Sequence, residues 1–166
     1  MERAATGRMR LVNEPSLANA VANVLNVPFV IVRRDLKITE GSTVSVNYVS
    51  GSSGDRIEKM FLSKRSLKAG SRVLIVDDFL KGGGTITGMI SLLSEFDSEL
   101  AGVAVFADNA QANRDYLDYK SLLKVTNIDV KANTIDVEIG NILTWSSRST
   151  FQGAANVARH WRKPWS

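Results

Sequence analysis

Apolar and polar positions along the chain predict an alternation of short strands and helices. Residues 73–76 and 100–106 are runs of mostly apolar side chains, typical of strands buried in a parallel sheet. Between them, residues 86–93 carry apolar side chains at helical spacing, and Thr85 is a suitable N-cap for that helix. We therefore predict a strand–loop–helix–strand unit. Its loop lies at the carboxyl edge of the sheet, the usual ligand position in open α/β folds.

Weaker patterns on either side complete a predicted α/β domain. Pro15 can open a helix, and Asn26 and Pro28 can end it. The other predicted elements are a buried strand at 29–32, a hairpin of strands at 43–50 and 56–63, a loop at 108–115, short strands at 122–125 and 128–130, and a returning strand at 134–139.

The two ends of the chain lack a lasting period. For residues 1–14 we predict an atypical or disordered N-terminus. Residues 15–144 form the predicted domain, and residues 145–166 form a basic tail that contains tryptophan. Such a tail can contact nucleic acid, whereas an unstructured terminus is the simpler interpretation.

The composition removes several function classes. The chain has 166 residues, of which 44% are hydrophobic and 23% are charged, as expected for one globular domain. Without cysteine it has no disulfide or thiolate metal site, and its single histidine, His160, excludes a Ser-His-Asp triad elsewhere. Neither a membrane-length apolar run nor a signal-peptide core is present, so we expect a soluble, cytoplasmic protein without a membrane partner. The net charge of +4 suits anionic partners.

Two carboxylates and a glycine-rich loop follow the first strand of the predicted unit. Asp77 and Asp78 come directly after residues 73–76. The loop lets backbone N–H groups curl toward an anion. It does not match a Walker loop, in which the lysine follows the glycines, or a dinucleotide fingerprint, in which the acid lies further downstream. Its residues are Lys81, Gly82, Gly83, Gly84 and Thr85.

The two acids restrict the kind of anion that this loop can take. Carboxylates repel a bare polyphosphate, but they accept hydrogen bonds from hydroxyls or hold a divalent cation. A ligand with a vicinal diol close to a phosphate is a ribose 5-phosphate. The alternative is that Asp77 and Asp78 only end a strand in a solvated turn, which explains the acids but not the order of strand, acids, loop and threonine.

Cations follow the strand predicted at 29–32. Arg33, Arg34 and Lys37 reach the same sheet edge as the acids if the two strands are parallel, and there they can face a pyrophosphate. A solvated strand end is the alternative. For the hairpin at 43–63, a role at the ligand and a plain solvent-exposed hairpin are both open.

The order of strand, acids, glycine loop and threonine resembles the phosphoribosyl-pyrophosphate (PRPP) motif of the type I phosphoribosyltransferase fold. The resemblance implies an α/β fold with a parallel sheet flanked by helices and an inserted β-hairpin that acts as a hood over the ligand. It also implies that Asp77 and Asp78 meet the ribose hydroxyls and that residues 81–85 bind the 5-phosphate.

Further segments resemble the effector domain of the bacterial pur operon repressors, over about residues 17–143. The hairpin sequence at 48–53 is the most specific of them. Members of that family are dimeric regulators of purine genes that sense PRPP in this domain and bind DNA through an N-terminal winged helix. The resemblance implies a pyrophosphate side formed by Arg33, Arg34 and Lys37, and a hood formed by Tyr48, Ser50, Gly51, Ser52 and Ser53.

We therefore expect a homodimeric effector domain that binds PRPP, with Mg²⁺ carried by the ligand and no metal site of its own. No catalytic residue is assigned, because Lys81 stands where hypoxanthine-type transferases carry an acid, and a cation cannot accept a proton from the base. DNA binding is expected only through a winged helix, which we do not expect within this chain. The resemblance also implies a first core strand before the predicted helix, and we expect residues 8–15 to lack it. The alternatives are an active purine or xanthine phosphoribosyltransferase and a ligand-poor domain that acts through dimerisation.

Overall fold

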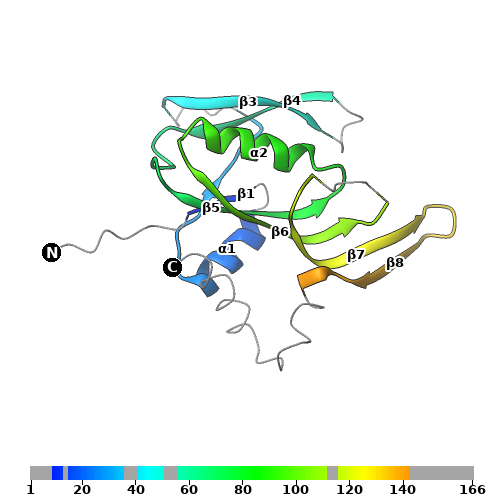
Figure 1. Cartoon of the computed structure of the whole chain (residues 1–166). Helices are drawn as coiled ribbons and strands as arrows, with labels where there is room; N and C mark the ends of the chain where they lie inside the picture. The colour runs from blue at the N-terminus through cyan, green and yellow to red at the C-terminus, as the bar shows by residue number, and fades with distance from the viewer. Residues whose placement is uncertain (1–8, 13–14, 36–40, 51–55, 112–115, 143–166) are drawn as a thin grey trace.

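A six-stranded sheet with a helix on each face forms the centre of the molecule (Figure 1). The computed structural model describes residues 9–12, 15–35, 41–50, 56–111 and 116–142. The strand order is β2-β1-β5-β6-β7-β8, and neighbouring strands are parallel except β7 and β8. The strands are β1 (Met9–Val12), β2 (Val30–Ile31), β5 (Arg72–Leu80), β6 (Glu99–Asn109), β7 (Lys120–Asp129) and β8 (Thr134–Ile139).

Helices α1 (Pro15–Leu25) and α2 (Gly84–Ser94) lie on opposite faces of the sheet (Figure 1). This explains why residues 73–76 of β5 are apolar without alternation, since all four side chains are buried. The helix α2 buries its apolar stripe in the same core, whereas α1 buries two alanines. The predicted fold class, a parallel α/β sheet flanked by helices, is confirmed.

The predicted hairpin is confirmed as β3 (Thr43–Ser50) and β4 (Arg56–Ser63), an antiparallel pair that covers the outer side of α2 (Figure 1). Its side chains Tyr48 and Met60 are buried in the main core. A Cβ at Gly88 of α2 would lie 2.7 Å from Tyr48 Cβ and 2.7 Å from Met60 Cε, so only a glycine allows this approach. Two backbone hydrogen bonds between Arg33 and Phe61 tie β4 to the chain after β2.

The expectation that the first core strand is missing is wrong. β1 lies inside the segment predicted to be atypical, and it pairs in parallel with both β2 and β5. Its four residues are too few to show a period, and its two neighbours in the sheet supply the hydrogen bonds that hold it. The strand predicted at 29–32 is shorter than expected, with only Val30–Ile31 paired at the sheet edge.

Several predicted boundaries are also wrong, each because a strand continues through polar residues. β5 runs on through Asp77 and Asp78 to Leu80. β6 takes in Asp108 and Asn109, which were expected in a loop, and Asp108 is buried. The two short strands predicted between residues 122 and 130 form one strand, β7. Pairing with neighbouring strands decides these lengths, and it is not visible in the local pattern.

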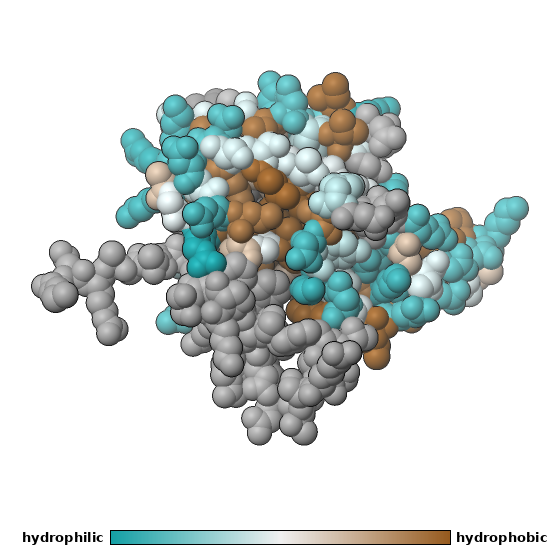
Figure 2. All heavy atoms as spheres, in the orientation of Figure 1, coloured by the Kyte–Doolittle hydropathy of each residue, from teal (hydrophilic) through white to brown (hydrophobic). Residues whose placement is uncertain are grey.

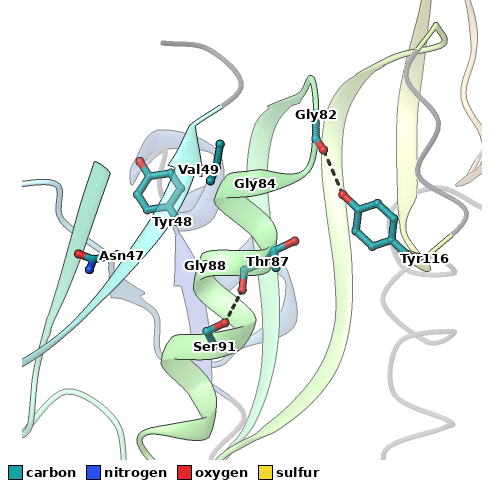
Figure 3. A pocket seen from close by; sticks show the side chains of 9 residues that line it. All are labelled: Asn47, Tyr48, Val49, Gly82, Gly84, Thr87, Gly88, Ser91 and Tyr116. Carbon is teal, nitrogen blue, oxygen red and sulfur yellow. Dashed lines mark hydrogen bonds between the residues drawn. The ribbon is translucent and has the colours of Figure 1, made fainter. Parts of the chain in front are cut away.

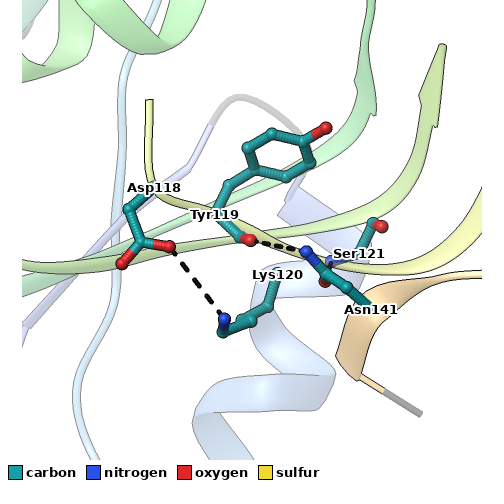
Figure 4. A network of polar contacts seen from close by, with 5 residues as sticks. All are labelled: Asp118, Tyr119, Lys120, Ser121 and Asn141. Atoms are coloured by element: carbon teal, nitrogen blue, oxygen red, sulfur yellow. Dashed lines mark hydrogen bonds and ion pairs between the residues drawn. The ribbon is translucent and has the colours of Figure 1, made fainter. Parts of the chain in front are cut away.

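The predicted returning strand is confirmed as β8, which pairs antiparallel with β7 at the edge of the sheet. The hairpin of β7 and β8 extends away from the core (Figure 1). All six residues of β8 are exposed, including Ile135 and Ile139, and Figure 2 shows hydrophobic side chains among the hydrophilic ones there. The base of the hairpin is fixed by Asn141, whose side chain accepts a hydrogen bond from the Ser121 amide at 2.8 Å and donates one to the Tyr119 carbonyl at 3.0 Å (Figure 4). Among the described helices, neither is long and apolar enough to span a membrane.

Candidate functional site

The two acids at the end of β5 differ sharply in their surroundings. Asp77 is 3% exposed, whereas Asp78 lies on the surface. The Asp78 amide donates a hydrogen bond to Asp77 Oδ1 at 3.2 Å, and the Phe79 amide donates one to Asp78 Oδ1 at 2.7 Å. Each carboxylate is thus bonded to the backbone amide of the next residue. Because β5 runs parallel to its neighbours β1 and β6, both acids lie at the carboxyl edge of the sheet.

Burial raises the pKa of Asp77 to about 7, and the nearby Asp78 carboxylate adds to the rise. The Asp78 amide and the Arg34 guanidinium act in the opposite direction. A carboxyl group with this pKa changes its charge near neutral pH, and it gains from any ligand that donates hydrogen bonds to its ionised form.

The turn after β5 presents the N-terminus of α2 without a side-chain cap. Gly83 is the N-cap at φ 85° and ψ −7°, a left-handed conformation that favours glycine. Thr85, expected as the N-cap, lies inside the helix instead. Because the first amides of a helix have no partner within it, and because the helix dipole is positive there, this end of α2 attracts an anion.

A cavity of about 160 Å³ joins the acids, the turn and one cation. It contains eight of the residues predicted for the site, and Phe79, Leu80 and Ile86 complete its wall. The predicted residues that line it are Arg34, Asp77, Asp78, Lys81, Gly82, Gly83, Gly84 and Thr85. The structure therefore brings these eight predicted residues together at this edge.

The other predicted site residues do not line this cavity. The backbone of Arg33 forms the bridge to Phe61 of β4. Tyr48 and Ser50, predicted for the hood, are buried, and Tyr48 packs in the main core. Lys37, Gly51, Ser52 and Ser53 lie outside the described residues.

A second, wider cavity of about 400 Å³ lies between β3, the outer face of α2 and Tyr116 (Figure 3). The Tyr116 hydroxyl donates a hydrogen bond to the Gly82 carbonyl at 3.1 Å, so the chain before β7 is attached to the glycine turn. The side chains of Thr87 and Ser91 face this cavity and bond to carbonyls one turn back. None of the described residues that line it is charged, which distinguishes it from the cavity at the acids.

An ion pair connects the cation of the first cavity to the hairpin. Arg34 Nη1 lies 3.8 Å from Glu58 Oε2 of β4, and the Tyr48 hydroxyl donates a hydrogen bond to the same oxygen at 2.6 Å. Burial, together with this hydrogen bond, raises the pKa of Tyr48 to about 12, so the phenol stays protonated as a donor.

Sequence reasoning missed Glu58, Tyr116 and Gly88. Gly88 carried a usable signal, because a glycine inside a helical pattern indicates close packing. Glu58 lies in a strand with ambiguous alternation, and Tyr116 follows a segment interpreted as a loop, so neither had a signal. Among the described residues, no group of three His, Cys, Asp or Glu side chains is arranged to hold a metal ion, so Asp77 and Asp78 would need further oxygen ligands from a bound molecule.

Comparisons with known proteins agree with this geometry. The model of the phosphoribosyl transferase domain family matches residues 16–140. The probable purine biosynthesis transcriptional regulator PurR of Streptococcus pneumoniae is 89% identical over 127 residues, which cover 76% of this chain and 46% of that protein. The purine biosynthesis transcriptional repressor PurR of Bacillus subtilis is 55% identical over 128 residues, which cover 76% of this chain and 45% of that protein. The chain thus spans less than half the length of these relatives.

A solved structure shows the same fold. The adenine phosphoribosyltransferase of Thermoanaerobacter pseudethanolicus matches with a TM-score of 0.63 at 24% identity, over 74% of this chain and 73% of that one. At this identity the likeness concerns the fold alone.

Proposed function

The chain belongs to the phosphoribosyl transferase domain family, and on that premise we propose that it is the effector domain of a regulator of purine biosynthesis genes. In this proposal the domain binds PRPP at the carboxyl edge of β5 and does not transfer its phosphoribosyl group. The regulatory role rests on the relatives, which are named as purine biosynthesis regulators, and the ligand rests on the chemistry of the cavity.

One observation carries the ligand assignment. A single cavity holds two carboxylates, the uncapped N-terminus of a helix and a guanidinium. These groups match, in order, a ribose diol, a 5-phosphate and a pyrophosphate. Asp77 and Asp78 accept hydrogen bonds from the hydroxyls, the amides from Gly83 onward bind the 5-phosphate, and Arg34 faces the pyrophosphate.

Lys81 supports binding without transfer. It lies at the cavity as a cation, so it cannot accept a proton from a purine nitrogen, although it can attract a phosphate. Mg²⁺ comes with the ligand in this proposal, because a pyrophosphate supplies the oxygen ligands that the two aspartates lack. The domain acts as a homodimer in the cytoplasm, and contact with DNA is made by a separate domain of the regulator.

Calorimetry tests the proposal. The protein is titrated with PRPP and Mg²⁺ and compared with Asp78→Asn, which removes the charge of an exposed side chain and should leave the fold intact. We expect the variant to bind at least about tenfold more weakly, because hydrogen bonds to a charged acceptor are strong. Asp118→Asn, at an exposed position outside the cavity, is the matched control and should bind normally. Equal binding by the wild type and Asp78→Asn, or no binding by the wild type, would refute the proposal.

A second assay separates sensing from transfer. The protein is incubated with PRPP, Mg²⁺ and each of adenine, guanine, hypoxanthine and xanthine, and released pyrophosphate is measured. The proposal expects no base-dependent release. Turnover with any of these bases would identify the chain as a transferase instead.

A further inference from the structure

Among the described residues that line the cavity, Arg34 is the one from outside the β5–α2 unit, and two carboxylates act on it. Glu58 Oε2 lies 3.8 Å from its Nη1, and Asp77 is close enough for Arg34 to lower the pKa of that carboxyl. Asp77 lines the cavity, whereas Glu58 is not among the described residues that line it. An anion that binds Arg34 from the cavity therefore meets a guanidinium already paired with a carboxylate outside that lining.

Glu58 is not free to move away from this position. Its Oε2 accepts the hydrogen bond from the Tyr48 hydroxyl, and the Tyr48 ring is buried beside Gly88 of α2. The Glu58 side chain is 25% exposed, so water screens its negative charge only in part. An anion that binds Arg34 therefore lies close to the negative charge of Glu58, and the two anions repel each other.

We infer that Glu58 competes with the pyrophosphate of the ligand for Arg34, and thereby sets how strongly the pocket prefers PRPP to ribose 5-phosphate. This inference rests on the proposed function and adds a specificity-determining residue outside the cavity. Ribose 5-phosphate contains the diol and the 5-phosphate but no pyrophosphate, so in this proposal it does not bind Arg34. The charge of Glu58 weakens PRPP binding and leaves ribose 5-phosphate binding nearly unchanged.

The inference also connects the ligand to the hairpin. When PRPP binds Arg34, the ion pair between Arg34, after β2, and Glu58 of β4 is lost. The hydrogen bond between Tyr48 and Glu58 remains within the hairpin. The backbone bridge between Arg33 and Phe61 does not involve the Arg34 side chain and stays in place. Amide exchange in β4 should respond to PRPP and not to ribose 5-phosphate.

The test is calorimetry with PRPP and with ribose 5-phosphate, both with Mg²⁺, on the wild type, Glu58→Gln and Glu138→Gln. Glu58→Gln keeps an oxygen that accepts the Tyr48 hydrogen bond and removes the charge. We expect it to tighten PRPP binding about threefold to tenfold, in the range of a partly exposed ion pair, and to change ribose 5-phosphate binding less than about twofold. Glu138→Gln removes the same charge from the exposed strand β8 and should change neither.

A second variant keeps the inference testable if Glu58→Gln does not fold. Glu58→Ala removes the carboxylate altogether, so it should tighten PRPP binding in the same direction and leave ribose 5-phosphate binding nearly unchanged. Weaker PRPP binding in Glu58→Gln, an equal change for both ligands or no change would overturn the inference while leaving the proposed function in place. Failure of the wild type to bind either ligand would overturn both.

Discussion

The two sides of the ligand cavity are built in different ways. The side formed by β5 and α2 is part of the main core, with Val76, Leu80 and Ile86 at most 2% exposed around the acids and the glycine turn. The other side is Arg34, whose side chain is 48% exposed and forms an ion pair with Glu58 at 3.8 Å. In our account, the sugar-phosphate half of the site is built before the ligand arrives, and the pyrophosphate half adjusts to it. The predictions below test that contrast.

The largest effect is expected at the glycine turn. Gly83→Ala places a side chain at φ 85°, which costs about 1–2 kcal/mol, and it distorts the amides at the N-terminus of α2. We expect both PRPP and ribose 5-phosphate to bind at least about tenfold more weakly by calorimetry. Gly70→Ala is the control, since Gly70 has φ 73° and open space around it, so it should lose similar stability and bind normally. A variant at Gly83 that loses only PRPP binding would contradict a prebuilt phosphate site.

The next effect concerns pH. In our account the ligand donates its hydroxyls to ionised Asp77, whose pKa of about 7 in the free protein is close to neutral. Affinity for ribose 5-phosphate should therefore rise roughly tenfold between pH 6 and pH 8 as the free carboxyl ionises. Asp77→Asn should bind more weakly and lose most of this dependence, leaving only that of the ligand's own phosphate. An unchanged pH profile in Asp77→Asn would show that Asp77 does not titrate in this range.

The same group makes a prediction for stability. The pKa of Asp77 is higher in the folded protein than its usual value of 3.8, so the folded state binds more protons than the unfolded state between about pH 4 and pH 7. Its contribution to the free energy of unfolding is therefore lost as pH rises through that window. Urea denaturation should show that Asp77→Asn becomes more stable relative to the wild type as pH rises from 5 to 8. A constant difference would count against the raised pKa.

A moderate effect is expected at the hairpin layer. Gly88→Ala introduces a Cβ 2.7 Å from Tyr48 Cβ, and such overpacking destabilises by about 1–3 kcal/mol. Urea denaturation should show this loss, reduced by the better helix propensity of alanine. Ser91→Ala, one turn along α2 at an exposed position, should change stability little. If PRPP binding in Gly88→Ala weakens more than ribose 5-phosphate binding, the hairpin acts on the pyrophosphate half.

The smallest effect is expected at Tyr116. Tyr116→Phe removes the hydrogen bond to the Gly82 carbonyl, which is exposed and adds about 0.5–1.5 kcal/mol at most. Because Gly83 and α2 fix the turn independently, ligand affinity should fall less than about threefold. A loss as large as that of Gly83→Ala would mean that Tyr116, rather than the core, holds the turn.

The prebuilt half of the site could be predicted from the sequence, whereas in the adjustable half Arg34 could be predicted and its partners could not. Asp77, Asp78 and residues 81–85 are contiguous, so a strand followed by a helix brings them together whatever the rest of the chain does. The partnership of Arg34, Glu58 and Tyr48 joins three segments, and it depends on how closely β4 approaches α2, which Gly88 decides. β1 escaped prediction for a similar reason, since its neighbours rather than its own four residues define it.

The most direct measurement of the central claim is a crystal structure of this protein with PRPP and Mg²⁺. Our account predicts the 5-phosphate within hydrogen-bond distance of the amides at the start of α2, with the ribose hydroxyls on Asp77 and Asp78. The pyrophosphate should lie beside Arg34, and Arg34 should have left Glu58. A ligand bound elsewhere, or oriented with its ribose away from the two aspartates, would contradict the account.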